Sequence, residues 1–127
     1  MSPVRWALLV TLALFMTSAG TYHFVRPEAY EALIPPILPA KRSLVYVTGV
    51  MEIGFALGLL VPAWRRWSAA GLIVTLIVVF PANVWMALQG GIDDRRLPAS
   101  FANPVVAWAR LPFQGLFIWW ASLFLRK

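Results

Sequence analysis

Four long stretches of the chain consist almost entirely of apolar and small uncharged residues. Residues 6–25 and 67–92 contain no acidic side chain, lysine or arginine, whereas residues 43–64 contain only Glu52 and residues 97–125 contain only Arg110. An α-helix needs about 20 such residues to cross about 30 Å of hydrocarbon. The pattern therefore predicts four transmembrane helices.

Prolines and polar residues set the bounds of these helices. Ser43 is a suitable N-cap, and Pro62 should end the helix that follows it. We expect transmembrane helices at residues 4–24, 43–62, 67–88 and 104–125. After the first of them, Pro27 and Glu28 suit the first turn of a short interfacial helix. The expected fold class is all-α: residues 1–127 form a single transmembrane domain, an integral membrane four-helix bundle with a short interfacial helix between helices 1 and 2.

The composition supports this interpretation, because 61% of the 127 residues are hydrophobic and only 13% are charged. The formal net charge of +6 raises the possibility of nucleic-acid binding. However, the basic residues form short clusters at the ends of the apolar stretches: Arg5, Lys41-Arg42, Arg65-Arg66, Arg95-Arg96 and Arg126-Lys127. This arrangement is typical of residues that anchor helices to lipid headgroups. We therefore expect the lipid bilayer as a partner and no nucleic acid.

The distribution of charge favours a cytoplasmic position for both termini. With that orientation five basic residues lie on each side, but those on the inner side occupy short segments without acids, and all four loop acids lie outside. Residues 1–19 also resemble a secretory signal, since Arg5 precedes an apolar run and small residues follow at a plausible cleavage site. Because the uncharged run continues to Phe24, we favour a retained helix over a cleaved one.

Cysteine and histidine usage limits the chemistry of the chain. There is no cysteine and only one histidine. Disulfides, thiolate nucleophiles, iron–sulfur clusters and bis-histidine haem ligation within the chain are excluded, and we expect no metal site. Any electron transfer would need a bound organic cofactor or another subunit.

Five polar side chains are expected to converge in one half of the membrane: His23, Glu52, Asn83, Arg110 and Gln114. The helices that carry Glu52 and Arg110 start from the same side, and at about 1.5 Å per residue both side chains lie roughly 8–13 Å below it. An ionised group at that depth costs about 2.5 kcal/mol or more, so such groups usually face inward and find partners. We interpret the five residues as a ligand-binding or proton-handling pocket.

Simpler interpretations of these residues remain open. Glu52 and Arg110 can form a purely structural ion pair, or Arg110 can extend to the headgroups. His23 can be an interfacial residue, and Asn83 and Gln114 are often hydrogen-bonding links between helices. Nothing in the sequence identifies a catalytic residue.

Gly54 and Gly58 form a GxxxG motif on the side of the helix opposite Glu52. Small residues at this spacing allow close packing of membrane helices. We assign these glycines to packing against a neighbouring helix or against a second protomer in a homo-oligomer.

Several short motifs occur in a distinctive order: His23-Phe24, Pro27 to Tyr30, Thr48 to Glu52, Ala56 to Pro62, Phe80 to Asn83 and Arg110 to Gln114. In these motifs the chain resembles the DoxX-like family of small four-helix bacterial membrane proteins, which is related to the DoxD and MauE proteins. The resemblance implies a bacterial inner-membrane protein associated with a redox complex. Members of the wider group include a thiosulfate:quinone oxidoreductase subunit and amine-dehydrogenase maturation proteins, so quinone is the candidate cofactor and a redox protein the candidate partner.

Three functional hypotheses follow. The first is an accessory subunit of a membrane redox system, with a small polar pocket in the periplasmic half. The second is a protein that binds or transports a lipid or small hydrophobic solute without electron transfer. The third is a structural scaffold that docks a partner through the glycine face. Whether the chain is an enzyme is left open by its sequence.

Overall fold

The computed structural model describes residues 1–125, which form five α-helices and one short 3-10 helix without any strand. The elements are α1 (Pro3–Val25), α2 (Pro27–Ala32), α3 (Lys41–Gly58), α4 (Arg65–Leu88), η1 (Ala99–Ala102) and α5 (Pro104–Ser122). The all-α prediction is confirmed, including a short helix between the first two long ones. By length and composition, α1 and α4 are each able to cross a membrane.

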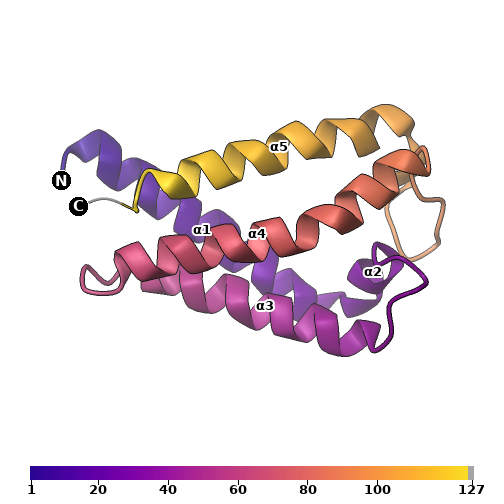
Figure 1. Cartoon of the computed structure of the whole chain (residues 1–127), viewed down its shortest axis with the longest axis horizontal. Coiled ribbons are helices and arrows are strands. Elements are labelled where there is room, and N and C mark those ends of the chain that lie inside the picture. The colour runs from indigo at the N-terminus through magenta and orange to yellow at the C-terminus, as the bar shows by residue number, and fades with distance from the viewer. Residues whose placement is uncertain (126–127) are drawn as a thin grey trace.

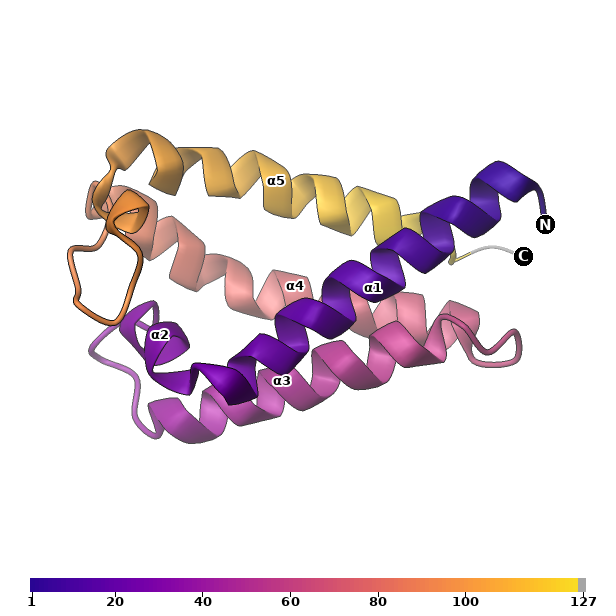
Figure 2. The ribbon, with the colours of Figure 1, turned by 180° about the vertical axis from the view of Figure 1, so that it is seen from behind.

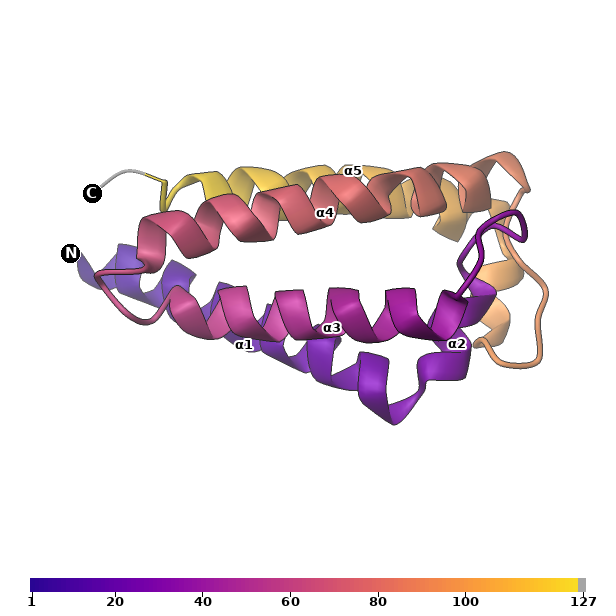
Figure 3. The same ribbon diagram turned by 60° about the horizontal axis from the view of Figure 1, so that its bottom comes forward.

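The four long helices lie side by side, and consecutive ones run in opposite directions (Figures 1 and 2). The N-terminus, the turn at residues 59–64 and the end of α5 lie together at what we call the terminal end. Helix α2, residues 33–40 and residues 89–103 lie at the opposite end, which we call the loop end. In Figure 3, α1 and α3 form one layer, and α4 and α5 form the other.

The main hydrophobic core lies in the half of the molecule near the terminal end. Its buried side chains come from all four long helices and their ends: Leu9, Leu12, Met16, Ala56, Leu59, Ala69, Leu72, Leu76, Ala121 and Phe124. At the loop end, α2 and the residues around η1 form smaller apolar clusters. The two layers are therefore joined tightly at one end and more loosely at the other.

Two glycines allow α1 and α3 to cross closely. A Cβ atom on Gly20 would lie 2.7 Å from Ile53 Cγ1, and one on Gly49 would lie 2.8 Å from His23 Cβ. Atoms at those separations overlap, so no larger residue fits without moving a helix. The close crossing places His23 of α1 beside Glu52 of α3.

Six of the eight predicted helix bounds differ from the structure, by one to four residues: for example, the helix expected at residues 4–24 spans Pro3–Val25, and the one expected at residues 67–88 spans Arg65–Leu88. The helix expected at residues 43–62 spans Lys41–Gly58. It ends early because Pro62 has no N–H and its ring would collide with the carbonyl of Gly58. It begins early because Ala40, at φ 54°, caps the helix, and its carbonyl accepts the first helical hydrogen bond from Leu44. Ser43 is thus not the N-cap.

The last helix ends at Ser122 rather than at residue 125. Residues 123–125 instead form turns closed by hydrogen bonds between residues three apart. The predicted basic cluster Arg126-Lys127 lies outside the described residues.

Candidate functional site

A cavity of about 530 Å³ lies between the two layers, towards the loop end. All five side chains singled out in the sequence line it: His23, Glu52, Asn83, Arg110 and Gln114. The predicted convergence of these residues from four helices is thus present in the structure. The cavity also has an apolar wall, which includes Leu33, Ile34, Leu38, Leu44, Val79 and Phe113.

His23 and Glu52 form the polar side of the α1–α3 layer. His23 Nδ1 lies 3.5 Å from Glu52 Oε2 and 2.7 Å from the carbonyl oxygen of Ala19. Both side chains are buried, with 7% of His23 and 8% of Glu52 exposed. Glu52 Oε2 is inaccessible to solvent yet accepts no hydrogen bond. A buried carboxylate oxygen that accepts no hydrogen bond is costly; its ion-pair partner in the structure is His23.

Tyr30 of α2 covers this pair, and the sequence-based site did not include it. Its ring stacks on the His23 ring, with centroids 3.8 Å apart and planes inclined by 21°. Its hydroxyl donates to the carbonyl of Ala19 at 3.3 Å. Burial is the main cause that raises the pKa of Tyr30 to about 12, so the hydroxyl stays protonated at neutral pH. The short helix therefore forms part of the cavity.

Arg110, Asn83 and Gln114 form a chain of hydrogen bonds in the α4–α5 layer. Arg110 Nη2 donates to Asn83 Oδ1 at 3.5 Å, and Asn83 Nδ2 donates to Gln114 Oε1. Gln114 Nε2 in turn donates to the carbonyl of Leu76 at 2.5 Å, close to the turn of α4 that Pro81 interrupts. Asn83 and Gln114 thus link α4 to α5, and they hold Arg110 at the cavity.

Arg110 itself is only partly buried, and its guanidinium carbon lies 4.9 Å from the centroid of the Phe101 ring. Its Nε atom is buried and donates no hydrogen bond. Phe101, in η1, is a second contact that the sequence did not indicate, because η1 was not predicted. The contact is a cation–π interaction, which favours a fixed position of the positive charge.

The hypothesis of a direct Glu52–Arg110 ion pair is wrong. Among residues 1–125, Glu52 has one ion-pair contact within 4.0 Å, which is with His23. It has none with Arg110. The reason is that each charge has partners within its own layer. Glu52 therefore faces the cavity from one side and Arg110 from the other.

The two glycines of the GxxxG motif have different environments. Gly58 packs against Ser68 of α4, and a Cβ atom there would collide with the Ser68 side chain. Gly54 has no heavy atom of another element within 4 Å of its Cβ position. The assignment to helix packing thus describes Gly58 within the chain, whereas none of residues 1–125 packs on Gly54. The glycines that bring the site together are Gly20 and Gly49, which the sequence did not single out.

Chemically, the cavity is lined by an acidic side chain on one layer and a basic side chain on the other, beside an apolar wall. Such a surface is complementary to an amphiphile whose head group both donates and accepts hydrogen bonds.

Comparison with known proteins gives a family and little more. The family model described as "Domain of unknown function (DUF8561)" matches residues 12–125, a span that contains every cavity residue named above. No curated protein and no solved structure matches the chain.

Proposed function

The chain belongs to the DUF8561 family, and we propose that it is a multi-pass protein of the bacterial inner membrane that binds an amphiphile in the cavity between its two helical layers. In this proposal α1, α3, α4 and α5 all cross the bilayer, and both termini are cytoplasmic. The terminal end then lies at the cytoplasmic face, and the cavity lies in the periplasmic half.

The apolar outer surface supports insertion of all four long helices. Large apolar side chains are exposed along the middle of each of them, for example Phe15 (54%), Val50 (61%), Val78 (62%) and Phe113 (60%). A soluble monomer rarely exposes apolar surface that is continuous over several helices. Surrounding lipid would remove this surface from water.

Because the chain contains no cysteine, introduced cysteines report on topology without background. Ser2 and Ser100 are exposed at opposite ends of the molecule. In intact cells with a permeabilised outer membrane, a membrane-impermeant maleimide should label Ser100→Cys. It should label Ser2→Cys only after the inner membrane is opened. Labelling of both from the same side would contradict four crossings.

The observation that carries the ligand proposal is that Glu52 and Arg110 line one cavity from opposite layers, and that Glu52 Oε2 accepts and Arg110 Nε donates no hydrogen bond. A quinol head group, the reduced form of a quinone, satisfies both: one hydroxyl oxygen accepts from Arg110, and the other hydroxyl donates to Glu52. His23, next to Glu52, is placed to exchange a proton with it. Asn83 and Gln114 hold Arg110 in position. The apolar wall would take the tail.

The assignment to a redox system rests on the resemblance to the DoxX-like proteins. We propose an accessory subunit that holds a quinone for a redox partner, since the sequence contains no cysteine and only one histidine. The mainly apolar wall of the cavity also favours a second candidate, a protein that binds or transports a lipid or small hydrophobic solute without electron transfer.

A titration with decylubiquinol, the reduced form of decylubiquinone, tests the proposal. Losing a hydrogen bond to a buried charged group costs about 1.5–3 kcal/mol, so Glu52→Gln and Arg110→Gln should each weaken binding about 10- to 100-fold. Glu28→Gln and Arg26→Gln are matched controls, because these residues pair with each other at 2.7 Å outside the cavity.

If folded Glu52→Gln and Arg110→Gln proteins bind as tightly as the wild type, the quinone proposal is wrong. If the wild type binds no quinone but retains a lipid that both variants lose, the second candidate replaces it.

A further inference from the structure

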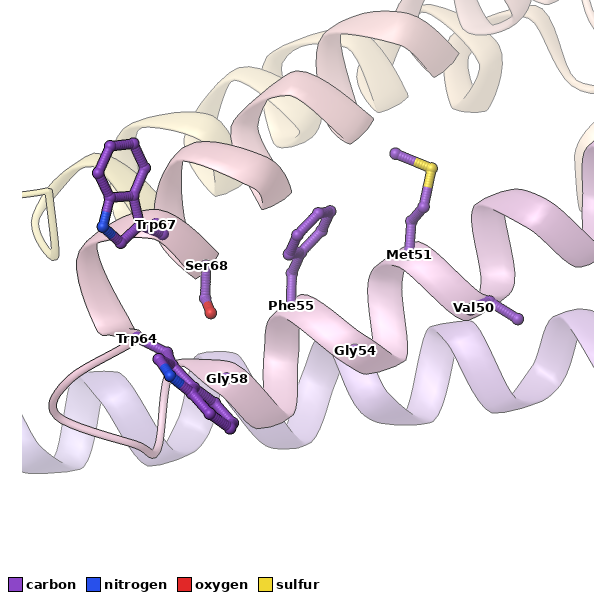
Figure 4. Close-up of a pocket in the computed structure, with 8 residues that line it drawn as sticks. All are labelled: Val50, Met51, Gly54, Phe55, Gly58, Trp64, Trp67 and Ser68. Carbon is purple, nitrogen blue, oxygen red and sulfur yellow. The ribbon is translucent and has the colours of Figure 1, made fainter.

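A second hollow lies at the terminal end, on the outside of the α3–α4 pair. It is a groove of about 520 Å³ lined by Val50, Met51, Gly54, Phe55, Gly58, Trp64, Trp67 and Ser68. Figure 4 shows Met51 and Phe55 extending from α3 towards α4, with Trp64 and Trp67 near the turn that joins the two helices. The groove lies well away from the cavity of His23 and Arg110, and shares no lining residue with it.

The shape of the groove suits a flexible chain better than a helix. A second helix docks on a GxxxG motif when both glycines are open to it. Here the space beside Gly58 is already occupied by Ser68 of α4, so of the two glycines only Gly54 has open space beside it. An open apolar groove of this kind can take an extended acyl chain.

Charge at the end of the groove indicates which lipid would fit. Arg66 is exposed, and its guanidinium carbon lies 5.8 Å from the centroid of the Trp67 ring, which lines the groove. Arg5 lies near the start of α1 and Arg65 begins α4, and both helices start at the terminal end. All five acidic residues lie elsewhere, four at the loop end and one, Glu52, in the cavity. A phosphate group beside Trp67 would therefore meet positive charge without a competing carboxylate.

We propose that this groove binds an anionic phospholipid, with one acyl chain between α3 and α4 and the phosphate at Arg66. Trp64 and Trp67 then lie at the level of the headgroups, where tryptophan is enriched in membrane proteins. The inference rests on the proposed membrane insertion, but it does not depend on what the cavity binds.

Native mass spectrometry of the purified protein in an equimolar mixture of phosphatidylglycerol and phosphatidylcholine tests the proposal. One arginine near the membrane surface contributes about fivefold to binding of an anionic lipid, so the wild type should retain phosphatidylglycerol about fivefold more than phosphatidylcholine. Arg66→Gln should lose this preference. Gly54→Leu fills the groove and should lose the bound lipid itself.

Gly115→Leu is the matched control, because Gly115 is also an exposed glycine in a long helix with nothing within 4 Å of its Cβ position. It should bind lipid as the wild type does. Equal lipid retention by the wild type, Arg66→Gln and Gly54→Leu would overturn the proposal. It would also be overturned if Gly54→Leu converted a wild-type dimer into a monomer while the bound lipid stayed unchanged. Failure of the wild type to float with vesicles would overturn membrane insertion as well.

Discussion

The close crossing of α1 and α3 makes a sharp prediction for Gly49→Ala. The added Cβ would lie 2.8 Å from His23 Cβ and 2.9 Å from Phe24 Cε2, where ordinary contacts begin at 3.4 Å. By subtraction, 3.4 − 2.8, the His23 contact alone requires a shift of 0.6 Å. Overpacking a well-packed interior typically costs about 1–3 kcal/mol.

Gly54→Ala on the same helix separates this packing cost from helix propensity. Replacing glycine by alanine in a helix gains about 1 kcal/mol at either position. Gly54 has open space around its Cβ position, so its variant keeps that gain in full. The difference in stability between the two variants is then the packing cost alone, about 1–3 kcal/mol.

Reversible unfolding by sodium dodecyl sulfate in mixed micelles, followed by circular dichroism, measures both stabilities. Gly49→Ala should be the less stable variant by that amount. It should also bind decylubiquinol more weakly, because the shift moves His23 relative to Glu52. Equal stability of the two variants would refute the crossing at Gly49, and with it the reason why His23 meets Glu52.

Three further predictions concern polar groups. The losses of stability caused by Asn83→Leu and Gln114→Leu should be non-additive in a double-mutant cycle, with a coupling energy of about 0.6–1.7 kcal/mol as for other interhelical hydrogen bonds in membranes. Additive losses would contradict the link between α4 and α5. The pKa of Tyr30 is raised to about 12, so its hydroxyl stays largely protonated up to about pH 11, one unit below that value. Up to that pH the wild type and Tyr30→Phe should therefore give the same tyrosinate absorbance. A difference between them that develops near pH 10 would contradict the burial of Tyr30. Arg96 lowers the pKa of Asp94 to about 2, so the pair should stabilise the fold fully above about pH 4 and progressively less down to pH 2. Asp94→Asn should remove that part of the acid dependence of unfolding, and an unchanged pH profile would contradict it.

Most of the helical architecture was predictable because it depends on local signals. Long uncharged runs separated by prolines and charges are sufficient to place four long helices and one short one. The errors at residues 41–43 and 59–62 come from backbone geometry at helix ends: a left-handed Ala40, and a proline that acts on the residue four positions earlier.

The five polar side chains of the site were also predictable, since depth along each helix follows from residue count. The pairing within it was not. Which residue Glu52 contacts depends on how closely α1 approaches α3, and Gly20 and Gly49 decide that approach. Tyr30 lies in a loop-end helix whose position over His23 is set by packing, and no periodicity encodes it.

The central claim is that Glu52 and Arg110 together hold the head group of one amphiphile. Organic extraction of gently purified protein, followed by mass spectrometry, tests it most directly. The wild type and the Glu28→Gln/Arg26→Gln control should each release the same quinone or lipid in stoichiometric amounts, whereas the Glu52→Gln/Arg110→Gln protein should release almost none. An equal yield from all three folded proteins would contradict the claim.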